Sequence, residues 1–404
     1  MKFTDEQASK IKEASEKYTD DIVTFLRDLI AIPSFSSQEG DCIKRIKEEM
    51  EKVGFDEVRI DAIGNVIGTI GNGPKKILYD SHIDTVAIAD PTAWNHDPFK
   101  GALKDDIIYG RGASDNKAAI ACMVYAGKII KELDLLPEDI TLYIAGVVQE
   151  EDCDGWAVYE MITTQGIKPD CVVLGECTNL AINRGHRGRC EIKVTTKGVS
   201  CHASAPERGV NAIYKMLPII QGIEKLQGNL KDDPFIGPGS IAVTSIECKT
   251  ASLNVVPDEC TIYIDRRMTV GETTESSIEE IKALPGAEEA EVSLLQYETP
   301  SWTGYQPEWD KYFPTWVLEE DHPLVEAGMK CGEILFGEMP PTSRWVFSTD
   351  GISTMGRLGI PTIGFGPAEE RHAHSVDDQV RIDHLTKSAM FYSLFPAVYS
   401  KHVK

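Results

Sequence analysis

The chain has 404 residues, of which 42% are hydrophobic and 26% are charged. This length exceeds what one hydrophobic core usually organises, so two domains are expected. The chain has 41 Lys and Arg against 64 Asp and Glu, a net charge of -23, and such a surface repels nucleic acid and anionic membranes. No apolar run is long enough to span a bilayer. We therefore expect neither a nucleic acid nor a membrane as a partner.

The N-terminal segment MKFTDEQASKIKEASEKYTDD is polar and lacks the apolar core of a secretory signal. The ten cysteines are scattered and form no Cys-x-x-Cys pair. Both features predict reduced thiols in a cytoplasmic protein.

The first part of the chain alternates between helical and strand-like patterns. Apolar residues at helical spacing predict one helix that stops before Pro33, a second that ends at Gly54, and a third from Asn116 to about Leu133. Buried strands are expected at KKILYDSHID, ITLYIAGVV and CVVLG. This alternation predicts an α/β fold with a mainly parallel sheet between helices. Ligands bind at the carboxyl ends of such strands, where polar residues gather in this sequence.

The pattern changes near residue 188. Residues 189–300 read as strand, helix, strand, strand, helix and strand, an order that predicts an inserted α+β split β-α-β domain. The α/β pattern resumes near His322 and ends in a helix from about His384. We expect a discontinuous domain of residues 1–188 and 301–404, interrupted by the inserted domain.

His82-Ile83-Asp84 closes the first of the buried strands. Alternate residues of a strand face the same side, so Asp84 could hydrogen-bond the imidazole of His82 and fix its tautomer. Asp115 stands in the loop GRGASDNK before the third helix, where it could serve as the helix N-cap, bridge two metal ions, or do both.

Three further positions follow strand ends or a Gly-Pro loop. Glu150-Glu151 could be an exposed turn, or one Glu could bind a metal while the other acts as a general base. Glu176 ends a short apolar strand, and His374 lies in RHAHSVDD, where it could also be a surface histidine. Taken singly, each of these residues more often has a structural role than a chemical one. Together they supply the nitrogen and carboxylate donors that zinc prefers, and two ions could share a bridging Asp.

Several segments, in order along nearly the whole chain, resemble one family of di-zinc enzymes: the aminoacylases, acetylornithine deacetylases, succinyl-diaminopimelate desuccinylases and glutamate carboxypeptidases. They are SHIDTV, GRGASDNKAA, VVQEEDCDG, the strand ending at Glu176, SCHASAPERGVNAI, NVVPDECTIYIDRRMTVGET and HAHSVDD. The resemblance implies one zinc on His82 and Glu176, another on Glu151 and His374, and Asp115 as the bridge.

The resemblance also implies catalytic roles. Glu150 would take a proton from the attacking water and pass it to the leaving nitrogen, and Asp84 would orient His82. The inserted domain would be a lid that forms a homodimer. His202 would reach the partner's active site and stabilise the oxyanion there. Asn254 would lie near the substrate, and Arg267 would grip a substrate carboxylate.

Two departures from the family pattern leave these ligands intact. Cys177 stands where many members have Pro, and Asp377-Asp378 replaces Asn-Glu or Asp-Glu. RGVNAI, EEDCDG, PSWTG and GIPTIGFGP are most similar to the subgroup called selenium-metabolism-linked hydrolases.

The sequence thus predicts a metal-dependent hydrolase. It would cleave an amide-type bond in a small carboxylate-bearing substrate, such as an N-acyl or N-carbamoyl amino acid or a dipeptide. The expected cofactors are two Zn²⁺ ions, with Co²⁺ or Mn²⁺ as alternatives. A different hypothesis is an inert member that only binds metal or a small molecule. An intact Glu150 argues against it.

Overall fold

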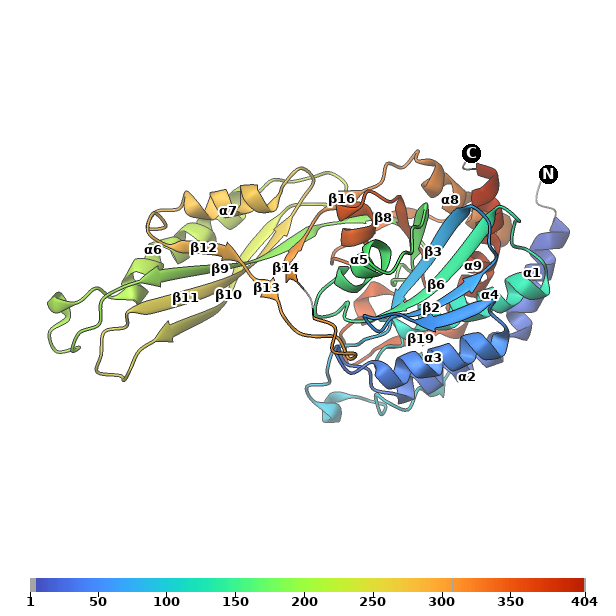
Figure 1. The fold of residues 1–404 in the computed structure, drawn as a ribbon, viewed down its shortest axis with the longest axis horizontal. Coiled ribbons are helices and arrows are strands. Elements are labelled where there is room, and N and C mark those ends of the chain that lie inside the picture. The colour runs from blue at the N-terminus through green and yellow to red at the C-terminus, as the bar shows by residue number, and fades with distance from the viewer. Residues whose placement is uncertain (1–4, 307, 403–404) are drawn as a thin grey trace.

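Two separate hydrophobic clusters organise the chain. The computed structural model describes residues 5–306 and 308–402. The larger cluster draws on residues between Ile11 and Ile182 and between Tyr297 and Tyr399. The smaller cluster lies between Cys190 and Ala287 and forms the elongated lobe at the left of Figure 1. The segment predicted as an inserted domain therefore has a core of its own.

A nine-stranded mixed sheet forms the centre of the larger lobe. Its order is β1-β2-β6-β3-β7-β18-β8-β16, with β17 also paired to β8. The central strands β6, β3, β7 and β18 are parallel, and antiparallel pairs extend the sheet at both sides. The α/β prediction is confirmed. The strands are β1 (Glu57–Ile60), β2 (Val66–Ile70), β3 (Lys75–His82), β6 (Ile140–Val147), β7 (Cys171–Leu174), β8 (Ile182–His186), β16 (Trp316–Val317), β17 (Thr342–Trp345) and β18 (Thr362–Gly364).

Helices pack against this sheet, and α4 contacts β3, β6 and α9. The predicted N-terminal helix is two helices that meet at Tyr18, whose φ and ψ of -96° and 3° depart from helical geometry. No helix among residues 5–306 and 308–402 is long and apolar enough to cross a membrane. The helices of this lobe are α1 (Asp5–Lys17), α2 (Thr19–Ala31), α3 (Gly40–Val53), α4 (Lys117–Glu132), α5 (Trp156–Thr163), α8 (Pro323–Phe336) and α9 (Ile382–His402).

The smaller lobe is an antiparallel sheet of order β10-β11-β9-β12 with two helices. Its elements confirm the predicted β-α-β-β-α-β sequence, and β10 is an edge strand. They are β9 (Gly188–Lys197), α6 (Ala212–Leu226), β10 (Ser240–Lys249), β11 (Glu259–Met268), α7 (Thr274–Lys282) and β12 (Glu291–Leu294). The short strand β15 (Tyr312–Phe313) returns from the larger lobe and pairs with β9.

Two small sheets pair strands that lie outside the two large sheets. One has the order β19-β5-β4 and joins the C-terminal region to the segment before the Asp115 loop. The other pairs β13 with β14. Their strands are β4 (Ala102–Lys104), β5 (Ile107–Tyr109), β13 (Gln296–Tyr297), β14 (Trp309–Asp310) and β19 (Gln379–Arg381).

The long strands of the smaller lobe point away from the larger one (Figure 1). Arg267 pairs with Arg189 at the near end, and Glu259 pairs with Lys197 at the far end. At about 3.3 Å per residue, these two ends are separated by about 25 Å. Residues at the far end therefore cannot reach the larger lobe of the same chain without a large rearrangement.

Candidate metal centre and active site

Three neighbouring parallel strands bring the acidic and histidine residues together. His82 is the last residue of β3 and pairs with Val147 at the end of β6. Glu150 and Glu151 follow β6, and Glu176 follows β7 after one glycine. Because the carboxyl ends of parallel strands meet at one edge of a sheet, these side chains converge there.

Asp115 lies between two groups of possible metal ligands. One oxygen, Oδ1, lies 2.9 Å from Nε2 of His82, which is itself 3.3 Å from Oε1 of Glu176. The other oxygen, Oδ2, lies 3.3 Å from Nε2 of His374, which is 2.8 Å from Oε2 of Glu151. Within each triad, the ligand atoms lie within 4.8 Å of one another. The donor set and its spacing fit two divalent ions that share one carboxylate.

Asp115 lies in the loop before α4, and its side chain does not cap this helix. The N-cap of α4 is Asn116, so Asp115 is not the cap that its sequence context also allowed. Its two carboxylate oxygens face the two histidines instead. Asp115 is buried, and a buried carboxylate needs such compensation.

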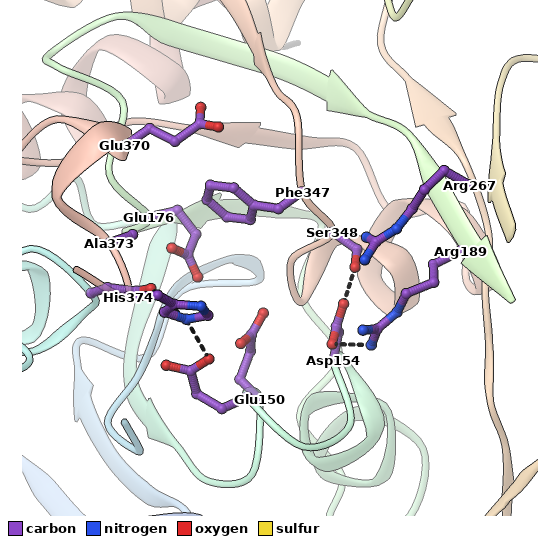
Figure 2. A pocket seen from close by; sticks show the side chains of 12 residues that line it. Glu150, Asp154, Glu176, Arg189, Arg267, Phe347, Ser348, Glu370, Ala373 and His374 are labelled. Carbon is purple, nitrogen blue, oxygen red and sulfur yellow. Dashed lines mark hydrogen bonds and ion pairs between the residues drawn. The ribbon is translucent and has the colours of Figure 1, made fainter. Parts of the chain in front are cut away.

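Glu150 stands beside the triads without belonging to either. Its Oε2 lies 3.9 Å from Nε2 of His82, and its side chain points into the same pocket as Glu176 and His374 (Figure 2). Gln149 adopts a left-handed conformation with φ of 59°, which turns the chain sharply at this point.

Asp84 contacts both His82 and the paired glutamates. The Nδ1 of His82 lies 3.1 Å from the carbonyl oxygen of Asp84 and 3.6 Å from its carboxylate. The carboxylate accepts the backbone N–H groups of Glu150 and Glu151, each at 3.1 Å, and the hydroxyl of Ser36 at 2.6 Å. The main-chain oxygen is therefore the closer partner of the imidazole, and the carboxylate mainly fixes the turn that carries the glutamates.

The ionisation of these groups reflects an excess of negative charge. Burial raises the pKa of Glu150 well above its usual value, and the nearby Asp154 and Glu176 add to this effect. Burial and the charge of Asp115 raise the pKa of Glu151 to about 7. Hydrogen bonds to Asp115 and Glu151 raise the pKa of His374 to about 10. Buried carboxylates that repel one another in this way favour the binding of a cation.

The pKa values of two members of the first triad, His82 and Asp115, are shifted by opposing effects. Burial alone would lower the pKa of His82, but Glu176 and Glu150 raise it well above its usual value. Burial alone would raise the pKa of Asp115, but hydrogen bonds from His374 and His82 hold it below its usual range.

A cavity of about 310 Å³ opens over this cluster. The inserted lobe contributes Arg267, whose guanidinium makes two hydrogen bonds to Asp265 at 2.8 and 3.0 Å. Twelve residues line the cavity: Asp115, Glu150, Glu151, Asp154, Glu176, Arg189, Arg267, Phe347, Ser348, Glu370, Ala373 and His374.

His202 and Asn254 do not line this cavity. They lie in the loops after β9 and β10, at the far end of the inserted lobe, and both are exposed. Nδ1 of His202 accepts hydrogen bonds from the N–H and hydroxyl of Ser204, and the carbonyl of Asn254 accepts the N–H of Ala203. Within one chain, the structure brings neither residue to the metal ligands.

The two histidines of RHAHSVDD have different surroundings. His374 joins the triad with Glu151, whereas His372 lies near Asp377 and Gln379 and lines another cavity. The structure thus places the histidine selected from the sequence in the cluster.

Six lining residues were not identified from the sequence: Asp154, Arg189, Phe347, Ser348, Glu370 and Ala373. Asp154 reads as part of an exposed turn, but its side chain is buried and accepts hydrogen bonds from Arg189 and Ser348. The only signal for Arg189 is its position opposite Arg267 on the neighbouring strand, which requires the strand register.

Comparisons with known proteins agree with this architecture. The chain is 48% identical over 388 residues to the uncharacterized protein YgeY of Escherichia coli (strain K12), covering 96% of each protein. It is 27% identical over 376 residues to the succinyl-diaminopimelate desuccinylase of Magnetococcus marinus, covering 90% of this chain and 94% of that protein.

Solved structures share the fold. The di-peptidase Dug1p of Saccharomyces cerevisiae matches with a TM-score of 0.72 at 14% identity, over 99% of this chain and 100% of that one. The Bacillus subtilis YxeP protein, a dinuclear metal binding peptidase, matches with a TM-score of 0.71 at 15% identity, over 96% and 100%. The model of peptidase family M20/M25/M40 matches residues 78–397. The chain belongs to this family of peptidases.

Proposed function

We propose that the protein is a two-zinc hydrolase that cleaves an amide-type bond in a small carboxylate-bearing substrate. The substrate class is an N-acyl or N-carbamoyl amino acid or a dipeptide. One observation carries this proposal: Asp115 is shared by two His-carboxylate triads, and the buried Glu150 lies beside them without joining either.

The proposed ligands are His82 and Glu176 for one ion, Glu151 and His374 for the other, and Asp115 for both. Imidazole nitrogens and carboxylate oxygens suit Zn²⁺, and this carboxylate-rich set also allows Mn²⁺ or Co²⁺. Two such ions would polarise the scissile carbonyl and make a nearby water more acidic.

Glu150 is the proposed general base and acid. Its pKa is raised by burial, so it can hold the proton that it takes from the attacking water and then deliver it to the leaving nitrogen. Asp84 holds the backbone of this residue through the N–H of Glu150, which keeps the carboxylate aimed at the cavity.

Arg267 is the proposed contact for the substrate carboxylate. It lines the cavity, and a planar guanidinium matches a carboxylate with two hydrogen bonds. The names of the relatives, a succinyl-diaminopimelate desuccinylase and a di-peptidase, support an amide substrate of this size.

The inserted lobe is the proposed dimer interface, through which His202 and Asn254 would enter the partner's cavity. The edge strand β10 leaves backbone groups unpaired, and such edges are usually covered. Large apolar side chains are also exposed along this lobe, which supports a partner surface there. They are Val199, Val210, Ile213, Tyr214, Leu217, Ile246 and Leu253.

The proposal extends to subgroup and location. The segments RGVNAI, EEDCDG, PSWTG and GIPTIGFGP support a place among the selenium-metabolism-linked hydrolases. The ten cysteines, none of which forms a disulfide, support a cytoplasmic enzyme.

The test is hydrolysis of a panel of N-acetyl, N-succinyl and N-carbamoyl amino acids and dipeptides by zinc-loaded protein, with chelator-treated protein as the control. We expect chelator-sensitive cleavage of one class. Cleavage that survives complete metal removal would refute the metal mechanism. Binding of two metals without cleavage of any compound would favour the inert binding protein instead.

A further inference from the structure

Two arginines lie directly opposite each other on neighbouring strands of the inserted lobe, at the end of these strands that is nearest the cavity. Arg189 of β9 and Arg267 of β11 are register partners, and both line the cavity. Figure 2 shows the two side chains reaching into the cavity from the lid strands, on the side away from His374 and Glu176. Like charges placed opposite each other across a sheet destabilise it, so the pair needs a compensating partner.

Acidic residues hold each arginine in place. The Nη2 of Arg189 donates to Oδ1 of Asp154 at 2.9 Å, and its guanidinium lies over the ring of Phe313 at 4.3 Å. The other oxygen of Asp154 accepts the hydroxyl of Ser348. Asp154 is thus buried between two donors, and Arg189 has a fixed orientation although it lies at the cavity wall.

Each guanidinium keeps donors that these acids do not use. The Nη1 of Arg189 lies 3.7 Å from Glu191, beyond hydrogen-bond distance. Arg267 uses Nε and Nη2 for Asp265, which leaves Nη1 for another acceptor. An arginine whose acid partner occupies only one edge can bind a second carboxylate with the remaining N–H groups.

The charge of the cavity favours an anion at this wall. Among the lining residues in the described part of the chain, Arg189 and Arg267 are the only lysines or arginines. The facing wall carries Glu150 and Glu176, and the whole chain has a net charge of -23. A substrate anion is therefore attracted to the arginine pair and repelled from most other parts of the surface.

We propose that Arg189 acts together with Arg267 as a two-guanidinium clamp on one substrate carboxylate, and that Arg189 determines the preference for a carboxylate over a neutral amide at that end. Asp154 and Ser348 are positioning residues for Arg189. This inference rests on the proposed function, since it assigns the uncleaved end of the same substrate to the lid wall.

The kinetic test compares an N-acyl amino acid with its carboxamide, both drawn from the class that the hydrolysis panel identifies. In Arg189→Met, kcat/KM for the carboxylate should fall about 10- to 100-fold, mainly through KM, because a charge-assisted hydrogen bond is lost. The carboxamide should change about threefold or less. Asp154→Asn should move the same ratio in the same direction by a smaller factor.

Arg357→Met is the matched control. Arg357 also pairs with an acid, Asp310 at 2.8 Å, and lies over an aromatic ring, Trp309 at 3.9 Å, but it does not line the cavity. This variant should leave the carboxylate-to-carboxamide ratio unchanged. An unchanged ratio in Arg189→Met as well would overturn the proposal.

A binding measurement separates the clamp from catalysis. Titration calorimetry with succinate, using the neutral diamide succinamide as the comparison, is made on chelator-treated protein so that metal ions cannot hold the carboxylate. We expect succinate binding that weakens in Arg189→Met and Arg267→Met and persists in Arg357→Met. Such a result without any amide hydrolysis would support the clamp and reject the proposed function. Hydrolysis together with succinate binding that is absent or insensitive to Arg189 would reject the clamp alone.

Discussion

Asp378 accepts two hydrogen bonds from Ser114, one from the backbone N–H and one from the hydroxyl, each at 2.7 Å. The same carboxylate accepts the N–H of Gly112 at 2.8 Å and pairs with Arg111 at 3.0 Å. Ser114 precedes Asp115, and Asp378 follows His374 by four residues. This contact therefore fixes the distance between two proposed metal ligands that are 259 positions apart in the chain.

Replacing Asp378 should weaken metal binding without removing a ligand. In Asp378→Asn, one oxygen acceptor and the charge opposite Arg111 are lost, so the loop that carries Asp115 should move relative to His374. We expect about a 10- to 100-fold loss of metal affinity, as for other residues that orient ligands. The measurement is competition for zinc with a fluorescent chelator.

The neighbouring Asp377→Asn is the control, because Asp377 is exposed and does not contact the Asp115 loop. Equal zinc affinity in the two variants would show that Asp378 does not position the site.

Glu150→Gln tests the proposed base while the metal ligands stay in place. The amide keeps the shape of the side chain but cannot accept the proton, so turnover should fall about 100- to 10,000-fold. Two metal ions per chain should remain, as measured by elemental analysis. Glu160→Gln, which removes a carboxylate that accepts a hydrogen bond from the hydroxyl of Tyr305, is the matched control. Activity close to that of the unsubstituted protein in Glu150→Gln would reject the base assignment.

The parts of the site that the sequence predicts well are those set by strand ends. His82, Glu150, Glu151 and Glu176 follow buried strands, and parallel strands place such residues at one edge whatever the loops do. The β-α-β-β-α-β order of the lid was equally predictable, because its strands and helices differ in hydrophobic period.

Residues whose position depends on register or on turn geometry were not predictable in this way. Arg189 faces the cavity because β9 pairs with β11 at a particular register, which no local pattern specifies. Asp154 is buried because the turn after Glu151 folds it against Ser348, far away in the sequence. The sequence predicts that the carboxylate of Asp84 binds His82, but this carboxylate mainly accepts the N–H groups of Glu150 and Glu151.

His186 makes the fold sensitive to acid. It is buried, its Nδ1–H donates to the carbonyl of Arg187 at 2.8 Å, and its Nε2 accepts the N–H of Thr349 at 3.2 Å. Burial lowers the pKa of His186 to about 4. The unfolded chain therefore binds a proton below about pH 6.5 that the folded chain does not, and stability falls until about pH 4.

When the pH is lowered from 7 to 5, protonation of His186 in the unfolded chain should reduce the unfolding free energy by about 2 kcal/mol. His186→Gln removes the titrating group, so its urea-unfolding free energy should lose about 2 kcal/mol less over the same interval. Chelator-treated protein is used, since acid also releases metal ions. His402→Gln, at an exposed position, should behave as the unsubstituted protein does. Identical pH dependence in all three proteins would mean that His186 is already charged in the fold or does not titrate differently on unfolding.

His202 and Asn254 lie about 25 Å along the lid from the cavity wall, so a role in catalysis requires a second chain. His202→Ala should reduce turnover about 100- to 1,000-fold, as the loss of an oxyanion donor does.

The decisive experiment mixes His202→Ala with Glu150→Gln under conditions that exchange subunits. In a mixed dimer, one cavity receives Glu150 from one chain and His202 from the other, so it is complete. Random exchange at equal amounts makes half of the dimers mixed, each with one complete cavity of two, and activity should recover to about a quarter of the unsubstituted level. Recovery to this level would establish that the site is shared between chains. If the mixture stays as inactive as its components while mass spectrometry shows mixed dimers, His202 does not act across the interface.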